Sequence, residues 1–252
     1  MPYFDFICKI GIQLLIRLKT VKHFVISRKV RTFALSKGKD DTTLLTHKAF
    51  MIMANKKIKN NGHEYVDLGL PSRTLWATCN VGAASPEETG AYFQWGGLQG
   101  YLPEQIGTDG CHTDFTIESY DLDKILKYKK GARLKMADDA ARANWGGLWH
   151  IPTYYQIAEL LASTKSEWTR LNGVSGRLFT SLKDKTKSIF IPASGDMVNG
   201  AILDTERYGL IWSSTLNKEH SAYAKYLGLW YGATFIGDDV LSSGLCIRAV
   251  IG

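Results

Sequence analysis

The side chains that most often perform catalysis are spread along this 252-residue chain without the spacing that catalysis requires. Ser213 and Ser214 follow Trp212 outside any GxSxG turn, so we interpret them as strand residues rather than nucleophiles. The histidines stand alone, with no HExxH pair and no carboxylates at metal-ligand spacing. They include His63, His112, His150 and His220. We therefore expect no catalytic residue and no enzymatic activity.

Two pairs of adjacent acids are the remaining candidates for acid–base chemistry. Adjacent residues point to opposite faces of a strand, which separates such carboxylates. We interpret Asp138 and Asp139 as the cap of a short helix. Asp238 and Asp239 are expected in a solvent-facing loop that could meet a ligand or a cation. Glycine-rich motifs that bind phosphate are absent from the sequence.

The cysteines form no recognisable metal or redox motif. Cys8, Cys79, Cys111 and Cys246 include no CxxC pair and no Cys/His cluster with zinc spacing. Free thiols are the favoured interpretation, and a disulfide between Cys79 and Cys246 is the alternative. We expect no metal and no cofactor.

The positive charge of the chain is confined to its beginning. Residues 1–50 hold ten Lys or Arg and three Asp, a difference of 10 − 3 = +7, which is the net charge of the whole chain. The remainder has 31 − 10 = 21 basic and 24 − 3 = 21 acidic residues and is neutral. A neutral domain lacks the electrostatic attraction for phosphate that nucleic-acid binding needs, so we expect no nucleic-acid partner.

Residues 1–52 are expected to be a basic extension, either disordered or upstream of the true start near Met53. The apolar stretch at residues 6–18 is too short and too charged to cross a bilayer, and it lacks the cleavage site of a signal peptide. A basic amphipathic helix on a membrane surface is the alternative. We predict no transmembrane segment, and the localisation stays open.

Hydrophobic periodicity predicts an α+β fold of mostly short antiparallel strands with one or two helices. The clearest element is a helix at residues 154–163, which begins with a capping box formed by Thr153 and Gln156. A shorter helix is expected at residues 140–144, ended by Gly146 and Gly147. Strands are expected at residues 64–68, 74–79, 91–95, 177–181, 188–191, 211–214, 223–230 and 245–250.

Several blocks together resemble the Fibrobacter succinogenes major paralogous domain family. The blocks are EYVDLGLPSRTLWATCNVGA (64–83), YFQWG (92–96), DDAARANWGGLWHIPT (138–153), SIFIPASG (188–195), YGLIWSST (208–215) and GLCIRAV (244–250). The resemblance implies a C-type-lectin-like fold over residues 53–252, related to the formylglycine-generating-enzyme fold. Relatives are often surface or phage-tail binding modules of Bacteroidetes, and some are varied near the C-terminus by diversity-generating retroelements.

The resemblance also implies a role for the tryptophans, and it allows a check for the calcium site of sugar-binding C-type lectins. Trp76, Trp145, Trp149 and Trp212 would be core residues whose ring N–H groups bond to backbone carbonyls. The calcium motifs of sugar-binding C-type lectins are absent, because Trp212 is followed by two serines. Ala249 replaces the usual proline of the family, which affects local geometry only.

The C-terminal strands hold the predicted ligand-binding surface. Ala224, Leu227 and Leu229 are expected to face inward, and the residues alternating with them to face outward. Exposed Tyr and Trp suit recognition because they offer large contact area with few rotors, although folding back onto the core is the alternative. The candidate residues are the strand positions Tyr226, Gly228 and Trp230, the following loop with Tyr231, Phe235, Asp238, Asp239, Leu241, Ser242 and Ser243, and a second loop at residues 196–199 with Met197 and Asn199.

The leading hypothesis is a binding and adhesion module for a protein or glycan on a cell surface, such as a phage-tail receptor-binding protein. The alternative is a structural or oligomerising domain of a surface or virion assembly, which includes a homo-oligomer. An enzyme of the formylglycine-generating type is the third hypothesis. That chemistry needs two neighbouring reactive cysteines near the C-terminus, where only Cys246 is found.

Overall fold

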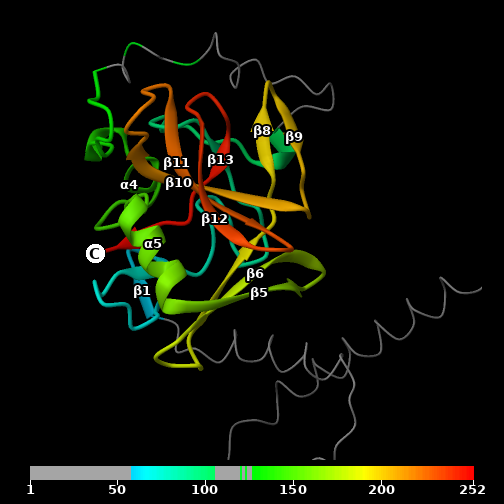
Figure 1. The fold of residues 1–252 in the computed structure, drawn as a ribbon. Coiled ribbons are helices and arrows are strands. Elements are labelled where there is room, and N and C mark those ends of the chain that lie inside the picture. The colour runs from blue at the N-terminus through cyan, green and yellow to red at the C-terminus, as the bar shows by residue number, and fades with distance from the viewer. Residues whose placement is uncertain (1–57, 106–119, 121–122, 124–126) are drawn as a thin grey trace, which may run out of the picture. The chain divides into compact units, whose positions relative to one another are not determined.

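The computed structural model describes residues 58–105, 120, 123 and 127–252 (Figure 1). The expectations for residues 1–52 lie outside these residues, as does most of the glycine-containing segment 106–126. Antiparallel sheets dominate the described chain, and its helices are short, which confirms the α+β class. No helix of the described chain is long and apolar enough to cross a membrane.

The largest sheet has five strands in the order β12-β11-β10-β13-β4. Its long strands form an antiparallel meander, in which Trp212 of β10 pairs with Tyr226 of β11 and Gly228 of β11 pairs with Phe235 of β12. The bounds are β4 Tyr92–Phe93, β10 Tyr208–Leu216, β11 Tyr223–Trp230, β12 Thr234–Val240 and β13 Leu245–Cys246. Among the described strands, β12 lies at the edge of this sheet.

A four-stranded sheet, β1-β2-β3-β14, joins the first and last described strands. Trp76 of β3 lies opposite Val250 of β14. Helices α4 (Ala140–Trp145) and α5 (Tyr154–Ser163) lie beside the C-terminal end in Figure 1. The strand bounds are β1 Ile58–Asn60, β2 His63–Asp67, β3 Leu75–Ala77 and β14 Val250–Ile251, and single 3-10 turns cover η1 Pro103–Gln105 and η3 Met136–Asp138.

Two smaller sheets complete the fold. β5, β6 and β7 form an antiparallel three-stranded sheet, and β8 and β9 form a hairpin that stands apart from it at the upper right of Figure 1. The bounds are β5 Thr164–Leu171, β6 Val174–Ser181, β7 Ser188–Pro192, β8 Asp196–Val198 and β9 Ala201–Leu203.

The capping residues in the sequence predicted helices α4 and α5 correctly. The Thr153 hydroxyl accepts from the Gln156 amide at 3.2 Å, and the Gln156 side chain accepts from the Thr153 amide at 2.9 Å, which is the predicted capping box. Asp139 caps α4 by accepting from the Arg142 amide at 3.0 Å. The same carboxylate accepts from the Ile151 amide at 2.9 Å and so ties α4 to the chain before α5.

Several segments differ from the sequence expectations. The strand expected at residues 245–250 is divided into β13 and β14, which belong to different sheets. β5 was missed, because TKSEWTRL is polar throughout and alternates only weakly. The loop expected at residues 196–199 is β8 followed by a turn in which Asn199 has a φ of 49°. The loop expected after Tyr231 is largely β12, whose charged residues suit an edge strand.

The core lies on both faces of the five-stranded sheet. The predicted core tryptophans are buried, with Trp76, Trp149 and Trp212 fully so and Trp145 at 6% exposure. The Trp212 ring N–H donates to the Phe93 carbonyl at 2.7 Å and that of Trp149 to the Asn60 carbonyl at 3.0 Å, as expected. The Trp76 ring N–H is buried, and no acceptor for it lies among the residues that the structure describes.

Ala224, Leu227 and Leu229 are fully buried, as predicted, but not on one face. Ala224 packs in the cluster around Trp212, and the two leucines pack in the cluster around Trp76. The expectation of one inward and one outward face was therefore wrong, because both faces of β11 are covered along most of its length.

Candidate functional site

Three aromatic residues of the predicted site reach solvent on β11, on β12 and in the turn between these strands. Trp230 is 38% exposed and Tyr231, in the turn to β12, is 73% exposed. Phe235 on β12 is 39% exposed, and Tyr226 is half-buried against the cluster around Trp212. The aromatic surface is thus centred on the β11–β12 turn.

Other predicted site residues are not displayed. Met197, Leu241 and Ser243 are buried with at most 3% exposure, because residues 197 and 244 form a β-bridge that closes this region. Ser242 is half-buried, and its carbonyl accepts from the Gln94 side chain at 3.3 Å. The side chains of Met197, Leu241 and Ser243 are therefore not accessible at the surface, contrary to the prediction that they contact a ligand. Asn199 is exposed, at the tip of the β8–β9 hairpin.

Gly228 is also buried, because an aromatic ring covers it. A β-carbon at Gly228 would lie 2.4 Å from Cζ of Phe235, and one at Gly237 would lie 2.5 Å from Cζ of Tyr226. The two rings meet edge to face, with centroids 6.0 Å apart. Such cross-strand packing of aromatics on glycines pins the register of β11 and β12. Tyr226 and Phe235 therefore have a structural role that the sequence did not reveal.

An open cleft of about 500 Å³ lies where β10, β11 and β5 approach one another. Sequence reasoning found Trp230 and Tyr231 and missed the other lining residues. Tyr208, for example, lies directly opposite Trp230 in the β10–β11 pairing and is 38% exposed. We call this site the aromatic cleft; it is lined by Trp168, Asp204, Glu206, Arg207, Tyr208, Trp230 and Tyr231.

The rings of the aromatic cleft form two walls. Tyr208 and Trp230 are nearly parallel, with an interplanar angle of 14° and centroids 6.2 Å apart. Tyr231 stands across Trp230 at an interplanar angle of 78°, with centroids also 6.2 Å apart. Flat apolar faces in two directions suit a ligand that itself has apolar faces.

A buried arginine fixes the backbone of the aromatic turn. Arg177 of β6 is 6% exposed and donates to the Trp230 carbonyl at 3.0 Å and to the Tyr231 carbonyl at 3.1 Å. Its third bond, at 2.7 Å, goes to the Ser166 hydroxyl on β5. Burial lowers the pKa of this guanidinium. Because the turn is held in place before any ligand arrives, less entropy is lost on binding.

The polar rim of the cleft comes from the turn between β9 and β10. Asp204 and Glu206 both have left-handed backbone conformations, with φ of 55° and 65°. That conformation is uncommon for glutamate and recurs at functional sites. Glu206 accepts from the Ser175 amide at 2.9 Å, which holds the turn against β6. Partial burial favours a higher pKa for Glu206, but the bonds from Ser175 and the ion pair with Arg170 together lower it.

Acidic side chains gather between the β8–β9 hairpin and β12. Burial, with the charges of Asp239 and Asp204, raises the pKa of Asp196 to about 6. Burial also raises the pKa of Asp239, which accepts from the Val240 amide at 2.7 Å. Lys225 neutralises the neighbouring Asp238 at 2.6 Å. Among the described residues, no group of three or more His, Cys, Asp or Glu has the geometry to hold a metal ion.

The Asp196 carboxylate predicts a pH-dependent stability. Its pKa is higher in the folded chain than the ordinary value of 3.8, so the folded state binds more protons and loses stability as pH rises from about 4 to about 6. Asp196→Asn should therefore melt higher than wild type above pH 6 and at the same temperature near pH 4. Asp184→Asn should melt lower than wild type at neutral pH, because bonds from Thr186 lower the Asp184 pKa and the ionised carboxylate therefore stabilises the fold. Thermal melts from pH 4 to 8 measure both; equal pH profiles for wild type and Asp196→Asn would contradict this.

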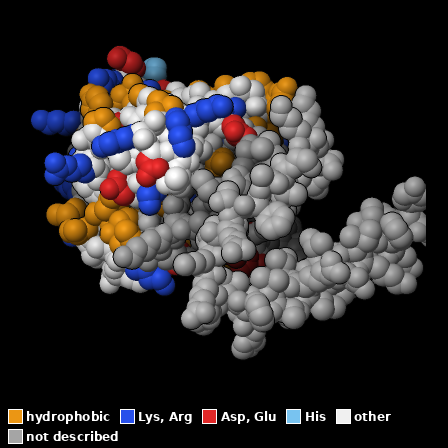
Figure 2. Space-filling model, turned by 90° about the horizontal axis from the view of Figure 1, so that it is seen from below, with side chains coloured by type: hydrophobic (Ala, Val, Ile, Leu, Met, Phe, Trp, Pro, Cys, Tyr) orange, Lys and Arg blue, Asp and Glu red, His pale blue; other side chains and the backbone are white. Residues whose placement is uncertain are grey.

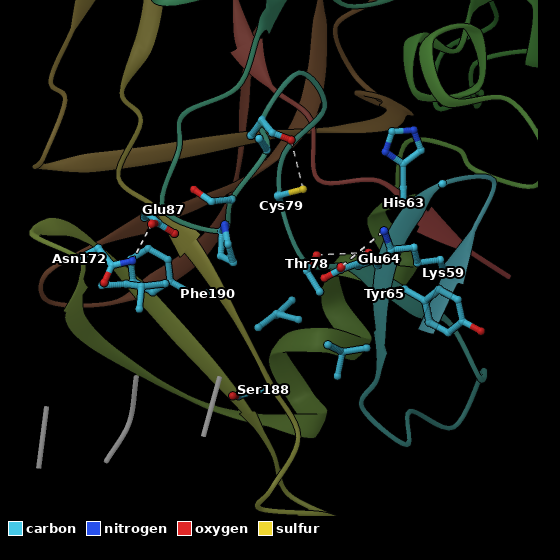
Figure 3. A pocket seen from close by; sticks show the side chains of 18 residues that line it. Lys59, His63, Glu64, Tyr65, Thr78, Cys79, Glu87, Asn172, Ser188 and Phe190 are labelled. Carbon is cyan, nitrogen blue, oxygen red and sulfur yellow. Dashed lines mark hydrogen bonds and ion pairs between the residues drawn. The ribbon is translucent and has the colours of Figure 1, made fainter. Parts of the chain in front are cut away.

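A second cavity, of about 520 Å³, lies between the β2–β3 strands and β7 (Figure 3). Burial and the nearby Lys59 lower the pKa of His63, whose ring stacks on Trp145 with centroids 3.9 Å apart. The Cys79 thiol donates to the Ala83 carbonyl at 3.4 Å, and burial raises its pKa. Glu87 and Asn172 bridge the opposite wall at 2.6 Å. The raised pKa of the Cys79 thiol disfavours the thiolate, which is the nucleophilic form of cysteine.

Cys79 and Cys246 are free thiols, as favoured by the sequence. Cys246 is fully buried, and burial raises the pKa of its thiol to about 12.

No protein-family model matches this chain, and comparisons with curated proteins and with solved structures gave no match.

Proposed function

We propose that this chain is a non-enzymatic binding module that presents the aromatic cleft to a macromolecule on a cell surface. The observation that carries the proposal is the group of exposed rings, Tyr208, Trp230 and Tyr231, on a backbone held by buried Arg177. Exposed aromatics are costly for solubility and enriched in binding hot spots, so a rigid cluster of them favours recognition.

The resemblance to the Fibrobacter succinogenes major paralogous domain family supports the same function. We propose the C-type-lectin-like fold for residues 53–252 on the order of the matching blocks. The pairing of β3 with β14, near the start and end of the described chain, is compatible with that fold. Surface display, on a cell or a phage tail, belongs to this proposal.

The charge of the described surface favours a specific contact over general adhesion. Figure 2 shows one face on which Lys and Arg side chains and Asp and Glu side chains are scattered among uncharged ones. A mixed surface lacks the single-sign field that drives non-specific binding to membranes or nucleic acids.

Replacing Tyr208, Trp230 and Tyr231 together with Ser should abolish binding to cells and leave the fold intact. Each aromatic hot spot contributes about 2 kcal/mol or more to binding, whereas surface substitutions shift stability by about 0.5 kcal/mol each. The measurement is flow cytometry of the labelled chain on fixed gut-bacterial and mammalian cells. EDTA should leave binding unchanged, because the calcium motifs are absent from the sequence.

The control variant replaces Leu148 and Tyr155, which are 62% and 71% exposed elsewhere on the molecule. It removes similar apolar surface and should bind like wild type. Binding that persists in the triple variant would place the site outside the aromatic cleft. Absence of binding by the wild-type chain, with concentration-dependent self-association that the triple variant loses, would favour the oligomerising domain instead.

A further inference from the structure

We infer that the ligand of the aromatic cleft is a neutral, pyranose-containing glycan, an assignment that rests on the proposed binding function. Three properties of the cleft lead to it: the charge of the rim, the arrangement of the rings and the chemistry of the polar groups beside them.

The charges around the cleft cancel in pairs. Arg207 Nη1 lies 3.6 Å from Asp204 Oδ1, and Arg170 Nη2 lies 3.4 Å from Glu206 Oε2. A cation among the rings would gain most from a free carboxylate beside it, and an anion would gain most from a free guanidinium. Here each would compete with the partner that the charged group already has. A neutral ligand complements the rim as it stands.

The rings specify the shape of that neutral ligand. A pyranose ring has apolar C–H faces and hydroxyl groups around its edge. Its face can lie on Trp230 or on the nearly parallel Tyr208, while the upright Tyr231 closes one side. This arrangement removes apolar surface of both partners from water and leaves the hydroxyls directed outward.

The polar groups at the rim of the cleft can form hydrogen bonds with the hydroxyl groups at the edge of the sugar. Carboxylates accept and guanidinium groups donate, so the exposed Asp204–Arg207 pair can take both hydrogen-bonding roles of a hydroxyl. Glu206 is held by the Ser175 amide and stays fixed. A flat protein epitope would use the exposed rings equally well, but it would not fill an open cleft of about 500 Å³.

The first test identifies the class of ligand on cells. Fixed cells that bind the labelled chain are treated with periodate, which cleaves the vicinal diols of sugars, or with proteinase K. Loss of binding after periodate and retention after proteinase K support the inference. Loss after proteinase K with retention after periodate overturns it and leaves the binding module standing with a protein ligand. If no cell binds the wild-type chain, the proposed function fails as well.

The second test uses defined probes and the full chain. Cellohexaose, xylohexaose, maltohexaose and mannohexaose are titrated by calorimetry and by tryptophan fluorescence. We expect at least one to bind, with about tenfold or greater weakening in Trp230→Ala and in Tyr208→Ala. Asp204→Asn keeps the left-handed backbone, which Asn tolerates, and should weaken binding through the lost charge alone. Tyr155→Ser is the control and should bind within about twofold of wild type.

Two results of this titration would overturn the inference. Oligosaccharide binding that survives Trp230→Ala would place the sugar elsewhere. Choline that binds the cleft while none of the four oligosaccharides does would show that the rings form a cation site despite the paired rim. In either case the cell-binding comparison of the triple variant decides separately whether the cleft is the recognition surface.

Discussion

Trp212→Ala is expected to destabilise the domain by about 3–5 kcal/mol, a large share of a typical total of about 5–15 kcal/mol. Trp212 is fully buried in the middle of the five-stranded sheet. The substitution would leave a cavity and also deprive the Phe93 carbonyl of the ring N–H that now donates to it at 2.7 Å. In space, β4 lies at the edge of the sheet, next to β13. The bond from Trp212 of β10 to Phe93 of β4 therefore connects strands that are distant in sequence.

The measurement is thermal unfolding by circular dichroism. We expect the midpoint to fall by about 10 °C or more. Trp230→Ala is the matched control, because it removes the same side chain from a 38% exposed position and should change the midpoint far less. A Trp212→Ala variant that melts with the control would show that the ring is not a core anchor.

The elements that could be predicted are those set by local interactions. Helix α5 depends on Thr153, Gln156 and the apolar positions Ile157 and Leu160, all within one short segment. The parallel pairing of β10 with β13, through Ile211 and Cys246, depends on contacts across the whole domain. No local pattern encodes such a pairing, because its free energy comes from burial that exists only after assembly.

In the candidate site, too, the local sequence pattern predicted some residues, and others depend on contacts between distant strands. Strand periodicity placed Trp230 at the surface, but it could not say whether a face is covered, so it also proposed Gly228, which Phe235 covers. Tyr208 was missed although it shares the alternation of β10 with Trp212. Pairing the two strands in the correct register would have set it opposite Trp230.

Arg248 is the second position at which a large effect is expected. Its side chain is fully buried and donates to three neutral oxygens: Asn80 Oδ1 at 2.9 Å, the Phe190 carbonyl at 3.0 Å and the Ala77 carbonyl at 3.3 Å. These acceptors belong to β3, the loop after it and β7. Burial lowers the pKa of the guanidinium to about 10, so it stays protonated at neutral pH. One residue near the end of the chain thus joins two sheets.

Arg248→Ala should destabilise the domain by about 3–5 kcal/mol, because it leaves a cavity and buried acceptors without donors. Arg248→Met separates the two causes. It fills most of the volume and removes the cost of burying a charge, so it should lose less than Ala but still about 2 kcal/mol, since the acceptors remain unpaired. Urea denaturation measures both, with the exposed Arg133→Ala as the control for an arginine at the surface. A Met variant as stable as wild type would show that the three bonds only compensate for burying the charge. The residue would then contribute by filling space, and the connection between β3 and β7 would depend on apolar packing instead.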